Sequence, residues 1–276
     1  MIIGIDIGST TTKIIGLKNG SSAGMLTVKA FDPVTSAAGA LGRFLIENRI
    51  PVSDIERIAL TGAGATKIDD NIFDIKTGKI DEMQAIGLGG SYLSGRRSGL
   101  IANIGTGTAL VNVRTDGKVE HVGGTGVGGG TIIGLANRLI KISDYEHIIE
   151  LAQKGKLSEV DLMINDISET DISFIKKNMT ASNFAKVSEN ARDEDLALGI
   201  LNMVFQVIGM LTVFASRSLG YDSVVITGNV GRNDIAYQIL NEIGAMYKTT
   251  YVFPENAQYA TALGAALSAA RPGQTA

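Results

Sequence analysis

Residues 1–17, MIIGIDIGSTTTKIIGL, contain two short apolar runs separated by a polar turn. The runs Met1–Asp6 and Thr12–Leu17 are typical of β-strands, and the Gly-Ser-Thr segment between them predicts a hairpin. A tight turn of this kind presents successive N–H groups and hydroxyls, which together form a concave site for an anion. The stretch therefore predicts a strand–turn–strand unit with a phosphate-binding turn.

Two charged residues flank this turn. Asp6 ends the first strand, where its carboxylate can hold Mg²⁺ through water, because this cation prefers carboxylates, phosphates and retained waters. Lys13 adds a cation beside the phosphates. Taken alone, these residues also fit an ordinary Gly-Ser turn in which Asp6 only caps the loop.

Two later segments have the same form. Leu100–Ile104 is an apolar strand that enters the turn Gly105-Thr106-Gly107-Thr108, so that NIGTGTALVNV repeats DIGSTTTKIIGL. A third buried strand ends in a Gly-Asn turn within Val224–Gly231, which suits the adenosine end of a nucleotide. A nucleotide held between two lobes needs one phosphate turn from each, so the order of these turns predicts two related α/β lobes, residues 1–99 and 100–276.

The rest of the chain alternates predicted strands and helices. Further strands are expected at Gly24–Phe31, Arg57–Thr61, Ala109–Val113, Asp222–Gly228 and Tyr247–Val252. Helices are expected at Ala37–Asn48, Glu82–Leu93, Asn233–Ile243 and Ala257–Ala269, the last with small residues that allow very close packing. Helices are also expected to dominate from Ile132 to Leu219, and the tail Arg271–Ala276 to be frayed.

Composition excludes several classes of protein. The chain has no cysteine, which excludes disulfides, thiolate zinc sites, a cysteine nucleophile and cysteine-ligated iron–sulfur clusters. Its net charge of −3, without long runs of like charge, gives no reason to expect nucleic acid or a membrane surface as a partner. Leu196–Ala215 approaches membrane length, but it carries Asn202, Gln206 and Thr212, which favours a buried helix. A cytoplasmic protein is expected.

Three further segments narrow the class. KIDEMQA (79–85), HVGGTGVGGGTIIGL (121–135) and MTASNF (179–184), together with the three turns, resemble the type II pantothenate kinases of the actin/hexokinase/Hsp70 superfamily. The resemblance extends from about Ile2 to Ala269. It implies a two-lobed actin-like ATPase fold, which is a duplicated ribonuclease H-like fold, with ATP and Mg²⁺ in the interlobe cleft. The implied activity is phosphorylation of pantothenate to 4'-phosphopantothenate, the first step of coenzyme A biosynthesis.

The resemblance also assigns roles to residues. Asp6 binds the metal, Glu82 is the general base, Thr106 lies at the transferring phosphoryl group, and Glu82, Thr106 and His121 contact the acceptor. The residues implied to bind the nucleotide are Asp6, Ile7, Gly8, Ser9, Thr10, Thr11, Thr12, Lys13, Thr106, Gly129, Gly130, Thr131, Ile132, Ile133, Tyr145, Gly228 and Asn229.

Chemistry gives independent support to Glu82. Transfer to a primary alcohol needs alignment, charge neutralisation and a carboxylate that takes the hydroxyl proton. Glu82 begins a predicted helix, where a carboxylate is well tolerated and can face a cleft. The residues alone favour Asp81 and Glu82 as ordinary first-turn acids, and the resemblance is what favours Glu82 as the base, with Asp81 as the second candidate.

One position departs from the family pattern. His121 stands where the family commonly has an arginine that helps to bind the acceptor, and imidazole is a poorer permanent cation than guanidinium. Pantothenate is then held differently or less tightly, or the acceptor is a related alcohol. A structural histidine is the alternative.

The segment Leu196–Leu219 is apolar nearly all round and needs burial on every side, which one small lobe cannot easily supply. In the resembling family a long helix in this region forms a dimer core, and the acceptor site is completed near the subunit interface. A homodimer is therefore expected, with a central intramolecular helix as the alternative.

Three other functions compete with this reading. The opening GIDIGSTTTK is also very similar to the ATPase activators of 2-hydroxyacyl-CoA dehydratases, but these need cysteine ligands for an iron–sulfur cluster. A sugar or other small-alcohol kinase of the same superfamily is the stronger rival, although its usual acceptor motif is not found here. A non-catalytic nucleotide-dependent scaffold is the third.

Overall fold

The computed structural model describes residues 1–171 and 176–270, and the expectation of a frayed tail therefore lies outside the described residues. The first sheet has the strand order β3-β2-β1-β4-β5. Strands β1, β2 and β3 form an antiparallel meander, whereas β1, β4 and β5 run parallel. The strands are β1 (Ile2–Ile7), β2 (Thr11–Lys18), β3 (Ser21–Lys29), β4 (Arg57–Thr61) and β5 (Thr77–Lys79).

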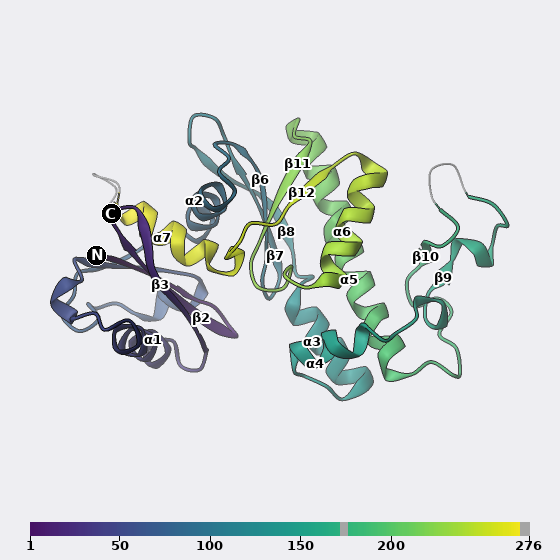
Figure 1. The fold of residues 1–276 in the computed structure, drawn as a ribbon, viewed down its shortest axis with the longest axis horizontal. Coiled ribbons are helices and arrows are strands. Elements are labelled where there is room, and N and C mark those ends of the chain that lie inside the picture. Colours follow the sequence, from purple (N-terminus) through teal and green to yellow (C-terminus); the bar gives the residue numbers. More distant parts are fainter. Residues whose placement is uncertain (172–175, 271–276) are drawn as a thin grey trace.

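The second sheet repeats this topology, with the order β12-β11-β6-β7-β8 (Figure 1). Its meander is β6-β7-β8, and β6, β11 and β12 run parallel. The strands are β6 (Gly99–Ile104), β7 (Thr108–Val113), β8 (Val119–Thr125), β11 (Ser223–Thr227) and β12 (Thr250–Val252). The repeat inferred from the two strand–turn–strand units is thus confirmed, and the fold is the duplicated, two-lobed actin-like ATPase fold.

Two helices lie between the sheets: α2 (Glu82–Ser94) and α7 (Ala260–Ala270) (Figure 1). Helix α2 packs on the second sheet, where Ile86 joins Ile101 and Val111 in one core cluster. Helix α7 packs on the first sheet, where Ala262 and Ala266 join residues of β2. Helix α2, which precedes the second sheet in sequence, thus packs on that sheet, and the C-terminal helix α7 packs on the first sheet.

The crossing of α2 and α7 depends on glycine. A Cβ atom at Gly89 would lie 1.8 Å from the Ala260 carbonyl oxygen, and a Cβ atom at Gly264 would lie 1.8 Å from that of Ala85. No side chain fits at either position, so the helix backbones touch directly. The close packing expected for the small-residue helix is confirmed.

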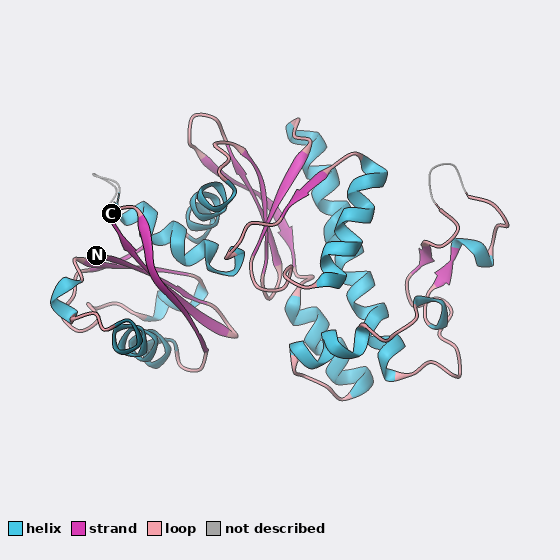
Figure 2. Cartoon of the chain, viewed as in Figure 1, coloured by secondary structure: helices cyan, strands magenta, loops and turns pink. Residues whose placement is uncertain are grey.

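Other helices cover the outer faces of the sheets (Figure 2). On the first sheet, α1 (Pro33–Asn48) is capped by Asp32, which accepts a hydrogen bond from the Thr35 N–H, and Phe44 and Leu41 are fully buried. The outer face of the second sheet shares a large core with α3 (Gly129–Ile140), α4 (Tyr145–Ala152), α5 (Asp193–Leu219) and α6 (Asp234–Tyr247).

The expectation that helices dominate from Ile132 to Leu219 is wrong for the middle of that range. Of the described residues between 153 and 192, none belongs to an α-helix; they form turns and the short pair β9 (Leu162–Met163) and β10 (Thr180–Ser182). The buried Asp161 carboxylate organises this segment, because it accepts hydrogen bonds from the Thr180 hydroxyl and the Asn202 amide. The short 3₁₀ turns of the chain are Val52–Asp54, Ala63–Lys67, Leu157–Glu159, Ile164–Asp166 and Ala257–Tyr259.

Helix α5 is the one helix among the described residues that is long and apolar enough to cross a membrane. However, 61% of its most apolar stretch is buried inside the protein, as in the core helix of a globular lobe. Its exposed apolar residues are Val207, Leu211 and Phe214, spaced by four and three residues. Such spacing places them on one face of the helix.

Candidate active site

The candidate site lies where β1 and β4 end and the first polar turn begins. Asp6 is 7% exposed, and its Oδ2 atom lies 3.6 Å from the Lys13 ammonium nitrogen. The pairing of β1 with its neighbours places Asp6 opposite both Lys13 on β2 and Thr61 on β4. Directly paired residues share one face of a sheet, so these three side chains form a group.

This group lies on the sheet face that α7 covers. Helix α7 packs against Gly4, Ile15 and Ala59. Each of these residues lies two positions along its strand from a member of the group: Gly4 from Asp6, Ile15 from Lys13, and Ala59 from Thr61. Because side chains alternate along a strand, Asp6, Lys13 and Thr61 face the same way at the end of the sheet. They therefore face the space between the lobes.

Two residues that the sequence assigned to the nucleotide site lie on the opposite face. Ile7 belongs to the core that α1 covers, and Thr12 pairs with Ile7 and is fully buried. Their side chains lie on the face of the sheet that α1 covers, so they cannot reach a ligand between the lobes. Any contact of Ile7 and Thr12 with the nucleotide is therefore made by their backbone groups, and their assignment to the nucleotide site stays a prediction.

The two turns predicted to bind phosphate meet between the lobes. The Ser9 and Thr106 hydroxyl oxygens lie 2.7 Å apart and share a hydrogen bond between the lobes. Both side chains are exposed, as is Thr10, and Thr11 is half-buried. In the first turn the Gly8 N–H donates to the Thr11 carbonyl at 3.1 Å, and in the second the Gly105 N–H donates to that of Gly107 at 2.9 Å. The structure thus brings together the two turns predicted from the repeat.

Glu82 is the first residue of α2, and it lies close enough to Asp6 and Lys13 for their charges to act on it. Burial raises the pKa of the Glu82 carboxyl, the negative charges of Asp6 and Asp81 raise it further, and Lys13 lowers it. Burial also raises the pKa of Asp6, which the Lys13 ammonium partly offsets. Asp81 is exposed, and its carboxylate caps the helix by accepting the Gln84 N–H.

The glycine-rich segment within residues 121–135 faces the first turn from the second lobe. The Gly129 and Gly130 N–H groups, at the start of α3, donate to the carbonyls of Gly105 and Thr106 at 2.8 Å. These donors are therefore used inside the protein, and the glycines serve the close approach of α3 to the turn. The Thr131 hydroxyl closes the helix start by accepting from the Gly128 N–H. The next two positions belong to the core, with Ile132 fully buried and Ile133 partly buried.

The third turn packs against this segment. Gly228 has a φ of 89°, and a Cβ atom there would lie 2.3 Å from the Ile104 carbonyl oxygen, so only glycine fits. The Tyr145 hydroxyl donates to the Val230 carbonyl at 2.8 Å and accepts from the Asn233 amide at 3.0 Å. Burial raises the pKa of Tyr145, so it remains a neutral donor. Asn229 is exposed at the turn itself.

His121 lies on β8, exposed, and opposite Val111. Val111 faces α2, so His121 lies on the sheet face that looks toward the first lobe. On the same strand, Val119 packs next to Gly87 of α2. His121 lies two residues further along β8, nearer to the turn at Gly105–Thr108.

Sequence reasoning missed two members of the site. Asn233, which orients Tyr145, was predicted only as a helix start, although asparagine at that position is a common cap. Thr61 ends the buried strand and begins the segment TGAGAT (61–66), but nothing in the sequence showed which face of the sheet it occupies.

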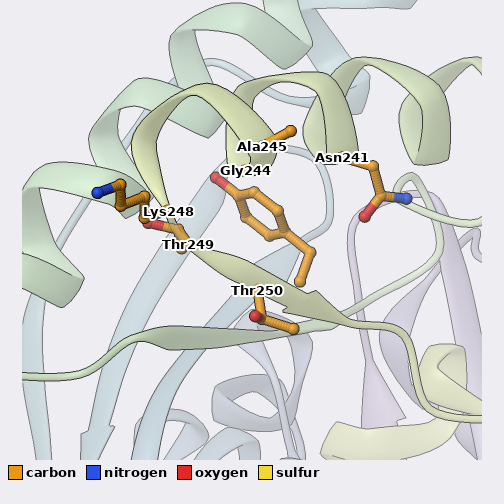
Figure 3. A pocket seen from close by; sticks show the side chains of 7 residues that line it. Asn241, Gly244, Ala245, Lys248, Thr249 and Thr250 are labelled. Carbon is orange, nitrogen blue, oxygen red and sulfur yellow. The ribbon is translucent and has the colours of Figure 1, made fainter.

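A cavity of the protein lies away from this candidate site. A shallow cavity of about 460 Å³ lies between α6 and β12 and is lined by Asn241, Gly244, Ala245, Lys248, Thr249, Thr250 and Tyr251 (Figure 3). No residue of the three turns lines it. Among the described residues, no three histidine or acidic side chains are grouped to hold a metal ion.

Comparison with known proteins agrees with this architecture. The chain overlays an activator of the 2-hydroxyisocaproyl-CoA dehydratase from Clostridium difficile with bound ADPNP, with a TM-score of 0.69, 21% identity and coverage of 96% of this chain and 92% of the other. It overlays a ROK family glucokinase from Streptomyces griseus in complex with glucose and AMPPNP, with a TM-score of 0.61, 13% identity and coverage of 96% and 97%. At these identities the likeness is one of fold alone, and the shared fold is the actin-like ATPase fold.

The sequence comparisons are more specific. Residues 99–268 match the Fumble family, and the chain belongs to this family. It is 29% identical over 277 residues to a protein named type II pantothenate kinase from Bacillus anthracis, with 97% of each chain covered. Fold and sequence together place the chain among the kinases of the actin-like superfamily.

Proposed function

We propose that this protein phosphorylates pantothenate to 4'-phosphopantothenate with ATP, as the first step of coenzyme A biosynthesis. The observation that carries the proposal is the grouping of Glu82, Asp6 and Lys13 beside two facing phosphate turns. A likeness over nearly the whole length to proteins named type II pantothenate kinase supports the choice of acceptor.

The two lobes divide the work on the nucleotide. The turn from Gly8 to Lys13 and the turn at Thr106 bind the phosphates, and Ser9 and Thr106 exchange their mutual hydrogen bond for phosphate oxygens. The adenosine end lies along the wall formed by the α3 start, Tyr145 and Asn229. In this arrangement the lobes are residues 1–99 and 100–276, with α2 and α7 crossing between them.

Magnesium fits the residues that are present. Asp6 supplies one buried carboxylate, and only its Oδ2 atom pairs with Lys13, so Oδ1 faces away from the ammonium group. The remaining ligands of a hydrated Mg²⁺ come from water and phosphate. When bound, the ion neutralises charge on the transferring phosphoryl group. Lys13 adds a second positive charge on the same side.

Glu82 accepts the proton of the acceptor hydroxyl. Its raised pKa brings its basicity closer to that needed near neutral pH, which favours proton transfer. Asp81 is the poorer candidate, since its carboxylate is exposed and holds the Gln84 N–H as a helix cap. His121 faces the same space from β8 and contacts the acceptor through its imidazole.

The protein acts as a cytoplasmic homodimer. Val207, Leu211 and Phe214 form an exposed apolar face on α5, and Phe214 is 59% exposed. Burying such a face against a second copy of α5 removes apolar surface from water.

The test is ADP release with pantothenate, pantetheine, glucose, N-acetylglucosamine and glycerol as acceptors. We expect release with pantothenate, and a loss of roughly 10²–10⁴-fold in Glu82→Gln with ATP binding retained. Release with a sugar alone would support the rival sugar kinase. No pantothenate-dependent release from wild-type protein would refute the assignment of the acceptor.

A further inference from the structure

Thr61 carries a buried hydroxyl that no protein group satisfies. The residue is fully buried, and among the described residues its Oγ1 atom has no hydrogen-bond partner. Buried polar atoms are nearly always paired with protein or with ordered water, and an exception needs an explanation. The position of Thr61 suggests one, because it lies at the candidate metal site.

Strand register puts Thr61 directly beside Asp6. The two residues are partners in the parallel pairing of β1 and β4, on neighbouring strands about 4.8 Å apart. Both lie on the face directed at the space between the lobes, two residues beyond Ala59, which packs with Ala265 of α7. Thr61 therefore lies next to the Asp6 carboxylate on that face.

The two Asp6 oxygens point to different neighbours. Oδ2 lies toward Lys13, at 3.6 Å from its Nζ atom. Oδ1 lies toward Gly62, the residue after Thr61, where a Cβ atom would come within 2.6 Å of it. Gly62 has a φ of 84°, which favours glycine, and a side chain there would clash with Asp6 Oδ1, so this oxygen lies close to the β4 backbone beside Thr61.

We infer that Thr61 is a positioning residue, whose hydroxyl oxygen accepts a hydrogen bond from a water molecule of the hydrated Mg²⁺ that Asp6 holds. This inference rests on the proposed kinase function. Waters on a metal ion are strong hydrogen-bond donors and need acceptors. On the side of Asp6 that faces Gly62, its Oδ1 atom is the one carboxylate oxygen, so the neighbouring Thr61 hydroxyl can supply a second acceptor. The described residues contain no group of three acidic or histidine side chains, so waters and the ATP phosphates would complete the coordination of the ion.

Thr12 provides a matched control within the same sheet. Its hydroxyl is likewise fully buried and without a partner among the described residues, but it faces α1 on the opposite side of the sheet. Thr12→Val and Thr61→Val make the same chemical change, with nearly the same shape, in two similarly buried places. Only Thr61 borders the candidate metal site.

The experiment uses the full chain as wild type, Thr61→Val, Thr61→Ser and Thr12→Val. The first readout is the binding of ATP by calorimetry over a series of Mg²⁺ concentrations and in EDTA, and the second is Mn²⁺ binding by electron paramagnetic resonance with ATP present. We expect Thr61→Val to raise the metal concentration for half-saturation by about 10–100-fold, as loss of a partner of a metal-bound group does. Affinity for ATP in EDTA should not change.

The control variants give the contrast. Thr61→Ser keeps the hydroxyl and should bind metal like wild type, and Thr12→Val should do the same. Thr61→Val should melt at the wild-type temperature or above it, because a methyl group replaces an unpaired hydroxyl. If Thr61→Val does not fold, Thr61→Ala removes the same hydroxyl with a smaller side chain.

Wild-type metal dependence in Thr61→Val, or a defect in Thr61→Ser as large as that in Thr61→Val, would overturn the inference. So would a fall in kcat without a change in metal dependence, since that result would place the hydroxyl at Glu82 or the acceptor instead. Neither binding readout requires pantothenate. A failure of the acceptor assignment is therefore seen separately, as the lack of pantothenate-dependent ADP release.

Discussion

Replacing Gly264 with alanine tests the helix crossing on which the position of Glu82 depends. The added Cβ atom would lie 1.8 Å from the Ala85 carbonyl oxygen, whereas ordinary contacts begin at 3.4 Å. The helices α2 and α7 must therefore separate by about 1.6 Å at this point. Neither helix can yield by rotating a side chain, because the obstacle is backbone. On the other side of the crossing, Gly89 meets the Ala260 carbonyl in the same way.

The cost follows from this geometry. Overpacking a core costs about 1–3 kcal/mol, and a backbone obstacle puts Gly264→Ala at the upper end of that range. Alanine in place of glycine recovers about 1 kcal/mol of helix propensity, so the net loss is about 2 kcal/mol. For a chain of this size we expect Tm to fall by about 4–8 °C. ADP release should fall too, because a displacement of about 1 Å in the active site can cost about 10²-fold in rate.

Gly39→Ala is the matched control. Gly39 lies within α1, and no heavy atom lies within 4 Å of the position its Cβ would take. The same substitution should there raise stability by about 0.5–1 kcal/mol, seen in calorimetry as a small increase in Tm. An unchanged or increased Tm in Gly264→Ala, as in Gly39→Ala, would refute the close crossing of α2 and α7.

Three other predictions concern the site and the assembly. The raised pKa of Glu82 should place the acidic limb of the pH–rate profile above the ordinary glutamate pKa of 4.5. Glu82→Gln should increase Tm at neutral pH, and this gain should shrink as the pH falls through the raised pKa toward 4.5. Equal gains in Tm at all pH values would contradict the raised pKa. Val207→Glu should convert a dimer to monomer or aggregate in sedimentation, and a well-folded wild-type monomer would contradict the proposed interface. His121→Arg should lower KM for pantothenate or leave it unchanged; a clear rise would show that the imidazole itself is required.

The sequence was sufficient to predict the two related halves. Each half begins with a strand whose apolar run ends at a glycine turn, and both signals are local, so they can be recognised without the rest of the chain. The small residues of Ala260–Ala270 likewise indicated a close helix contact. Local pattern also placed Glu82 at a helix start.

What the sequence could not supply depends on contacts between distant segments. Strand β8 contains two adjacent glycines and has a weak strand signal, and it forms because β7 offers an edge to pair with. The irregular segment between α4 and α5 depends on Asp161, whose partners Thr180 and Asn202 come from later in the chain. A helical pattern read locally cannot include such bonds.

The first phosphate turn shows the same limit at the level of single residues. Thr11, Thr12 and Lys13 are consecutive polar residues, and the sequence assigned all of them to the nucleotide. Register separates them, because Thr12 pairs with Ile7 over the α1 core and Lys13 pairs with Asp6 at the cleft. A shift of one residue in that pairing would exchange their faces.

The position of Glu82 combines both kinds of information. Its helix is held to the second sheet by Ile86, yet Ala85, three residues after Glu82, packs with Ala59 of the first sheet and Ala265 of α7. The start of α2 therefore contacts both lobes, and Glu82 reaches Asp6 although they belong to different packing units. A movement of the lobes would change the distance between Glu82, the proposed base, and the proposed metal site at Asp6 only as far as the crossing of α2 and α7 permits. The glycines at that crossing thus restrict how the two halves of the site meet.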